Sequence, residues 1–129
     1  MAYPSGSGTE VLRRMRINSQ SNTETAFRWD GTDPSVGTDS YTVPADCMVT
    51  VLNITFQEQG NAEENLNLYM TPSWGGTVWL LNTQILLGYG DPFIWNDKFM
   101  LLAGDRMTVV LSNAGSIDVW CSYLFTDWT

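Results

Sequence analysis

The chain has 129 residues, a formal net charge of −8, 43% hydrophobic and 12% aromatic residues, and no histidine. This length suits one domain, and the composition is too apolar for intrinsic disorder. No stretch approaches the roughly 20 apolar residues that span a bilayer. The first eight residues lack the charged and apolar regions of a signal peptide, so we expect a protein that is made and folded in a cytoplasm.

The charge is divided unevenly along the chain. Residues 1–30 carry four arginines against three acids, whereas the other 99 residues carry only Lys98 and Arg106 against eleven acids. An acidic body repels nucleic acid and anionic lipid, so we expect neither as a partner. The split predicts an acidic body, residues 31–129, preceded by a basic N-terminal arm and lead-in segment, residues 1–30.

The arm leaves two structures open. Residues 1–8 are rich in Gly, Ser and Pro, which predicts a flexible lead-in. Residues 9–17 fit a strand with Val11, Arg13, Met15 and Ile17 on one face, or a short helix that groups Val11, Leu12 and Met15. Residues 26–29 resemble a short strand closed by Asp30-Gly31, and a loop is expected from there to residue 40.

The body predicts short strands separated by turn signals. The expected strands are residues 41–43, 48–56, 66–70, 77–81, 84–87, 93–95, 99–102, 107–111 and 117–125. The strand 48–56 is expected to place Met48, Leu52, Ile54 and Phe56 on one face, and the last strand alternates from Ile117 to Phe125. We therefore predict an all-β fold: an antiparallel two-sheet sandwich or jelly roll of about 8–10 strands with an extended N-terminal arm.

Reactive chemistry is hard to assemble from these residues. Without histidine the usual general base and the commonest zinc ligand are missing. Cys47 and Cys121 are too few for a metal site and are expected to be small core residues, with a disulfide as the lesser alternative. Lys98 is expected to pair at the surface. We predict no enzyme, no catalytic residue and no small-molecule substrate.

Cofactors and metals are likewise not expected. Glu58, Asn61, Glu63 and Glu64 form an oxygen-rich stretch that could hold Ca²⁺ weakly, but it lacks the EF-hand pattern. A solvated hairpin tip is the favoured interpretation. We predict no metal site and no cofactor.

The six tryptophans divide into two groups. Trp29, Trp79, Trp95 and Trp120 fall in strand-like runs, which favours core or sheet-face positions. Trp74, beside Gly75-Gly76, and Trp128 near the C-terminus are the better candidates for exposure. An exposed tryptophan can contact another subunit or stack on a sugar, and the protein contact is favoured because interfaces are enriched in Trp.

A set of turn and strand phrases carries a resemblance. They are Tyr41-Thr42-Val43-Pro44-Ala45, the strand 49–56, Phe93-Ile94-Trp95-Asn96-Asp97-Lys98-Phe99, Leu102-Ala103-Gly104-Asp105 and Asp118-Val119-Trp120-Cys121-Ser122-Tyr123. In their order, over roughly residues 38–125, they resemble the small β-sandwich virion proteins of tailed bacteriophages. Such proteins serve as capsid cement or decoration proteins, or as tail and fibre modules. The chain departs from the pattern at Asp46-Cys47, where a glycine and a lysine would be expected.

The resemblance and the charge split together predict a non-enzymatic virion protein that docks on the capsid through its arm. Its expected partners are the major capsid protein or other virion subunits, and further copies of itself as a homo-oligomer; its expected location is the capsid surface after assembly in the host cytoplasm. The expected partner-binding residues are Val11, Leu12, Arg13, Arg14, Met15, Arg16, Ile17, Trp74 and Trp128. A tail or fibre module is the alternative within the virion, and a carbohydrate-binding adhesion module is the alternative of another class. A further alternative is that residues 9–17 form an edge strand of their own domain.

Overall fold

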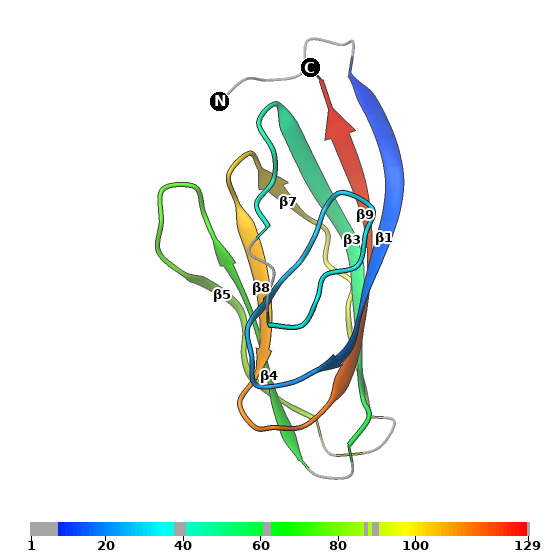
Figure 1. The fold of residues 1–129 in the computed structure, drawn as a ribbon, viewed down its shortest axis with the longest axis vertical. Coiled ribbons are helices and arrows are strands. Elements are labelled where there is room, and N and C mark those ends of the chain that lie inside the picture. The colour runs from blue at the N-terminus through cyan, green and yellow to red at the C-terminus, as the bar shows by residue number, and fades with distance from the viewer. Residues whose placement is uncertain (1–7, 38–40, 61–62, 87, 89–90, 129) are drawn as a thin grey trace.

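Two antiparallel sheets packed face to face make up the computed structural model, which describes residues 8–37, 41–60, 63–86, 88 and 91–128 (Figure 1). The first sheet has five strands: β1 (Thr9–Gln20), β3 (Cys47–Glu58), β6 (Pro92–Trp95), β7 (Phe99–Leu102) and β9 (Ile117–Asp127). The second has four: β2 (Thr25–Ala26), β4 (Glu64–Thr71), β5 (Val78–Leu86) and β8 (Arg106–Leu111). The predicted all-β two-sheet fold is confirmed.

Strand order places β1 at one edge of the five-stranded sheet. The order is β1-β9-β3-β6, with β7 also paired to β3 on the side of β6. The four-stranded sheet has the order β2-β8-β4-β5. Apart from β4 and β5, strands that follow each other in the chain are not paired, and the chain crosses between the layers repeatedly. Among the described residues no helix is long and apolar enough to cross a membrane.

The core lies between the layers and is filled by alternate residues of the long strands. Ile117, Val119, Cys121 and Tyr123 are fully buried along β9, as the alternation of that segment predicts. Trp29 packs edge-on against Tyr123 with ring centroids 5.0 Å apart. Burial raises the pKa of Tyr123 to about 12, because the charged phenolate would lose its hydration.

A β-bulge in β3 corrects the predicted face of two residues. The register against β9 shifts between Val51 and Asn53, so two residues of β3 advance where β9 advances one. Val49 and Val51 before the bulge therefore face the core together with Ile54 and Phe56 after it. The sequence pattern wrongly grouped Met48 and Leu52 with Ile54, because strict alternation has no allowance for an inserted residue.

Residues 9–30 are not a detached arm. Thr9–Gln20 form β1, which pairs with β9 along most of its length, and Met15 and Ile17 are buried in the core. Phe27 and Trp29 are fully buried as well. The prediction of an arm separate from the body is wrong for these residues, because their apolar side chains complete the domain's own core. Residues 1–7 of the predicted lead-in lie outside the described residues.

Two local features of the sequence are clarified. Asp46, at the departure from the bacteriophage pattern, has φ 58°, in the left-handed region that favours glycine and that Asp tolerates. Cys47 and Cys121 are free and buried, as predicted for small core residues. Burial raises the pKa of both thiols, which keeps them protonated and weakly reactive at neutral pH.

Candidate functional site

The face of the five-stranded sheet that points away from the core exposes large apolar side chains. Leu12 on β1 is 69% exposed, Ile94 on β6 54%, Met100 on β7 53% and Trp120 on β9 39%. Strand register places them in two rows: Leu12 and Met100 lie level with Leu124 and Thr50, while Trp120 and Ile94 lie level with Arg16 and Thr55. We call this surface the outer face; its principal residues are Leu12, Arg14, Arg16, Ile94, Met100 and Trp120.

The three arginines of β1 take two different roles. Arg13 lies on the core side, where its Nη1 donates to the Trp29 carbonyl oxygen at 2.9 Å and its guanidinium lies 4.4 Å from the centre of the Phe125 ring. Arg14 lies on the outer face, 4.9 Å from the centre of the Trp120 ring. Arg13 therefore stabilises the fold, whereas Arg14 adds positive charge to the outer face.

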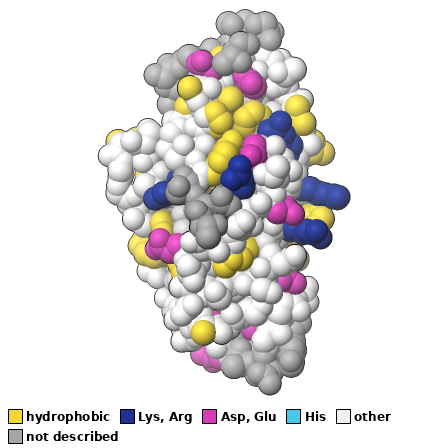
Figure 2. All heavy atoms as spheres, viewed as in Figure 1, with side chains coloured by type: hydrophobic (Ala, Val, Ile, Leu, Met, Phe, Trp, Pro, Cys, Tyr) yellow, Lys and Arg dark blue, Asp and Glu magenta, His cyan; other side chains and the backbone are white. Residues whose placement is uncertain are grey.

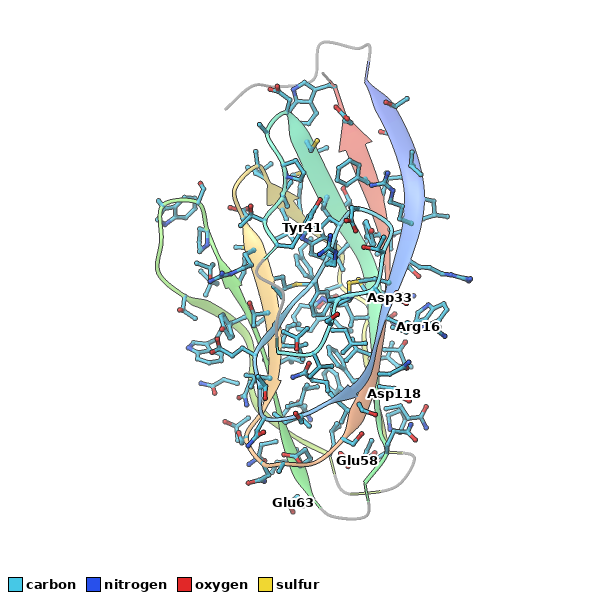
Figure 3. All side chains as sticks on the ribbon, in the orientation of Figure 1. Arg16, Asp33, Tyr41, Glu58, Glu63 and Asp118 are labelled. Carbon is cyan, nitrogen blue, oxygen red and sulfur yellow. The ribbon has the colours of Figure 1, made fainter. Side chains whose placement is uncertain are left out.

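Arg16 is held at the edge of the sheet by Asp33. Its backbone N–H donates to Asp33 Oδ1 at 2.9 Å, and its Nε lies 3.3 Å from Asp33 Oδ2. Figure 3 shows the two side chains together at the margin where β1 runs. Both side chains are about half exposed, so the pair positions Arg16 but contributes little to stability.

Two shallow hollows flank Trp120 on the outer face. The larger has a volume of about 310 Å³ and lies between β1 and the 31–33 loop. The smaller has a volume of about 170 Å³ and lies over β3 and β9. The residues common to both linings are Arg16 and Trp120. An apolar ridge between two open hollows is a shape into which side chains of another protein can fit.

Charge on the visible surface is distributed unevenly. Figure 2 shows most of the visible Lys and Arg side chains along the margin where β1 lies. Glu58 and Glu63 lie at the lower end of the sheets in Figure 3, away from that margin. On a chain of net charge −8, the β1 margin thus carries Arg14 and Arg16 together with the acidic side chains of Glu10, Asp33 and Asp118.

The residues predicted to bind a partner do not form one surface. Leu12, Arg14 and Arg16 lie on the outer face, and Val11 is 44% exposed on the opposite side of the same strand. Met15 and Ile17 are buried, so they cannot contact a partner without unfolding β1. The assignment of these two residues to partner binding is therefore wrong.

The two tryptophans predicted to be exposed behave differently. Trp74 is 84% exposed in the turn between β4 and β5, and that turn lies on the opposite side of the molecule from β1 (Figure 1). Trp128 is partly buried, and its indole nitrogen is enclosed without a hydrogen-bond partner among the described residues. Trp128 is therefore less exposed than predicted, because its indole nitrogen is enclosed, whereas Trp74 is largely exposed as expected.

Sequence reasoning missed three residues of the outer face: Ile94, Met100 and Trp120. The alternation of β9 places Trp120 on the same face as Asp118 and Ser122, opposite the core residues. It therefore indicated that the Trp120 side chain is exposed. Ile94 and Met100 lie within short apolar runs, where no alternation distinguishes the two faces. Their position became apparent only from the pairing of β6 and β7 with β3.

Titratable groups give no sign of catalysis in the described part of the chain. Glu58 is buried, and burial raises its pKa, but only the Gly60 N–H donates to it, at 3.0 Å. No cluster of three or more Cys, Asp or Glu side chains suited to a metal ion occurs among the described residues. The outer face offers apolar surface, hydrogen-bonding groups and charge for contact with another molecule.

Comparison with known proteins identifies the fold. No protein-family model matches the chain, and no curated protein is similar to it in sequence. Among solved structures, the chain is similar to a subunit of Bacillus endospore appendages, described as disulfide-linked pili, with 11% identity, a TM-score of 0.52 and coverage of 100% of this chain and 97% of that one. It is also similar to the Drosophila NLP core, described with pentamer formation and histone binding, with 11% identity, a TM-score of 0.50 and coverage of 92% and 99%.

A protein of the infectious bursal disease virus particle is a weaker match. The identity is 10% and the TM-score is 0.49, over 96% of this chain and 32% of the viral one. This chain thus spans about a third of the viral protein's length. Identities this low establish the shared two-sheet architecture of the first two proteins and no more.

Proposed function

We propose that this chain is a non-enzymatic structural subunit of a virion, and more specifically a capsid decoration or cement protein of a tailed bacteriophage. The observation that carries the proposal is the outer face, on which exposed apolar side chains and two arginines share one sheet surface. Its partner is an acidic, partly apolar surface of the major capsid protein or another virion subunit. Docking there reinforces the particle without any chemical step.

The balance of forces on the outer face favours a protein partner. Exposed ion pairs contribute only about 0–1 kcal/mol each, so Arg14 and Arg16 alone would hold weakly. Burial of Leu12, Met100 and Trp120 would add roughly 25 cal/mol per Å² of apolar surface removed from water. The apolar residues thus supply affinity, and the arginines select an acidic partner and fix its orientation.

The docking element differs from the arm that the sequence suggested. The buried part of β1 belongs to the domain. We therefore assign docking to a preformed sheet face, the outer face, and not to a separate N-terminal segment. A preformed face loses little conformational entropy on binding, which favours affinity over a segment that must order first. Two solved structures that share the fold with a TM-score of at least 0.5 are described with disulfide-linked pili and with pentamer formation, which is in keeping with a fold used for assembly.

The test compares two matched double variants for binding to purified particles that lack the protein. Leu12→Ser with Trp120→Ser removes apolar surface from the outer face, and Val78→Ser with Trp79→Ser removes similarly exposed surface from β5 of the other sheet. We expect the first pair to lower occupancy about tenfold or more and the second to bind like wild type. Equal occupancy for both pairs would exclude the outer face as the docking surface.

The salt dependence of particle occupancy separates the contribution of the arginines from that of the apolar side chains. Arg14→Ala with Arg16→Ala should weaken occupancy and also flatten its dependence on ionic strength, because fewer charges remain to be screened. Lys98→Ala with Arg106→Ala removes the same formal charge away from β1 and is the control. An unchanged salt dependence in the first pair would contradict an acidic partner.

One observation favours an adhesion function as a second candidate. Trp74 stands 84% exposed beside Gly75 and Gly76, whose left-handed φ angles of 92° and 88° shape an open turn. An exposed indole ring can stack on a sugar. Added glycans should then quench its fluorescence, and Trp74→Phe should abolish the response; a lack of response to a broad glycan panel would remove this candidate.

A further inference from the structure

Among the described residues, β9 alone pairs with β1, and the opposite edge of β1 carries exposed side chains on both faces of the strand. Leu12 is exposed on the outer face and its neighbour Val11 on the core side, so neither sheet covers this part of the strand. Figure 1 shows β1 as the outermost strand on its side of the molecule. An uncovered edge strand of this kind is a template for pairing with another strand.

The hydrogen-bonding direction of each residue in β1 follows from one contact. The Arg16 N–H donates to Asp33, away from β9. Because N–H and C=O groups of alternate residues in an antiparallel strand point to the same side, those of Glu10, Leu12 and Arg14 also point away from β9. Asp33 occupies the edge at Arg16, so the open stretch runs from Thr9 to Met15.

This open stretch is complementary to itself. When two copies of β1 run antiparallel with Leu12 opposite Leu12, Glu10 of each copy lies opposite Arg14 of the other. All three of these pairs have outward-pointing backbone groups, so each exchanges hydrogen bonds across the new junction. The same register places Val11 beside the aliphatic part of the partner copy's Arg13. Opposite charges directly across a strand pair are favourable, and a central Leu–Leu contact adds apolar burial.

We propose that two copies of this chain pair through β1 in that register, joining their five-stranded sheets into one continuous sheet about a two-fold axis. The charge pattern favours the second copy as the occupant, because antiparallel self-pairing places Glu10 of each copy opposite Arg14 of the other. The contact at Asp33 limits the pairing to residues 9–15, so the dimer is weak in solution. In an assembly, neighbouring copies at high local concentration would pair fully.

The pairing does not depend on what the outer face binds. It uses the backbone edge of β1 and shares the side chains of Leu12 and Arg14 with the outer face, whereas Ile94, Met100 and Trp120 belong to the outer face alone. A dimer would place two outer faces side by side and strengthen docking through two linked contacts. Failure of either idea leaves the other testable, because self-association is measured with no partner protein present.

A charge-swap series tests the register by sedimentation equilibrium of the purified chain at low salt. The wild-type mass should rise from 14.5 kDa towards twice that value as the concentration approaches about 1 mM. Glu10→Arg alone or Arg14→Glu alone places like charges opposite each other twice per dimer and should raise the dissociation constant about tenfold or more. The double variant, Glu10→Arg with Arg14→Glu, restores opposite charges and should restore dimerisation. Lys98→Glu, which makes the same charge change as Arg14→Glu elsewhere, should dimerise like wild type.

Amide hydrogen exchange by NMR gives an independent readout. On raising the concentration, the amides of Glu10, Leu12 and Arg14 should gain protection, while those of Val11 and Arg13, already directed at β9, should not change. A chain that stays monomeric at about 1 mM, a double variant no better than its parents, or uniform protection across residues 9–15 would each overturn the proposal.

Discussion

Glu58 shows how one buried carboxylate links the stability of this fold to pH. Its side chain is 1% exposed, and Oε2 has no hydrogen-bond partner among the described residues. Burial raises its pKa above the usual value of 4.5, and the negative charges of Glu64 and Asp91 act in the same direction. The folded state therefore binds this proton more tightly than the unfolded chain does.

Replacement of Glu58 by Gln should change the pH dependence of unfolding. The folded-state pKa is raised, so the stabilising contribution of the protonated carboxyl is present below about pH 4.5 and is lost as pH rises through the folded-state value. Wild type should thus lose stability relative to Glu58→Gln as pH rises above about 4.5. Urea unfolding of both proteins across this range measures the difference. A difference that stays constant with pH would show that Glu58 does not titrate differently on folding.

Thr83 provides a second prediction at the scale of one residue. Its φ of 64° is in the left-handed region, which is strained for a β-branched side chain, and its N–H donates to Asn67 Oδ1 at 2.9 Å. Thr83→Gly keeps that hydrogen bond and relieves the strain, so it should stabilise the fold by about 1 kcal/mol. Thr50→Gly, within β3, should instead destabilise by about 1 kcal/mol, and equal effects of the two changes would contradict the assignment.

At the scale of elements, the question is whether β1 is an integral strand of the domain, since it carries three of the six Lys and Arg residues. Met15→Ala or Ile17→Ala should lower the free energy of unfolding by about 2–5 kcal/mol, because each leaves a cavity between the sheets. Leu12→Ala, on the same strand but exposed, should change it by no more than about 0.5 kcal/mol. Urea unfolding distinguishes these outcomes; a small effect at Met15 and Ile17 would mean that β1 is not an integral strand.

The elements that could be predicted from sequence are those with a clean period of two. β9 alternates over its full length, and its core residues were identified correctly. β1 could not be resolved between strand, helix and arm, because Val11 and Leu12 are exposed on opposite faces while Met15 and Ile17 are buried. The faces of β3 could not be predicted since a bulge interrupts its alternation, and the pairing of β6 and β7 beside it depends on contacts distant in sequence.

Part of the candidate site could be predicted from the sequence, and again this was the part that depends on local signals and not on contacts distant in sequence. The arginines of β1 were identified by charge, which is visible locally. Their division into the structural Arg13 and the exposed Arg14 and Arg16 depends on the direction of each side chain in a strand that was itself ambiguous. Trp120 could be assigned to the site only once the two sheets were placed. Its side chain lies on the face of β9 that the four-stranded sheet does not cover.

At the scale of the whole molecule, the two faces of the five-stranded sheet serve different purposes. The inner face holds the core, and the outer face exposes apolar and basic side chains on an otherwise acidic chain. An assembly subunit needs such a preformed contact surface and no reactive groups. In the proposed β1 pairing, this sheet would extend from one copy to the next while its outer face remains the proposed docking surface.

The number of copies in each purified particle tests most directly whether this chain is a decoration protein, and quantitative mass spectrometry of particles of the bacteriophage proposed to encode it can measure that number. A decoration protein that docks by its outer face at every equivalent capsid position should be present on the order of hundreds of copies. A tail or fibre module would be present in only a few copies. Complete absence from purified particles would contradict the proposal that this chain is a structural subunit of a virion.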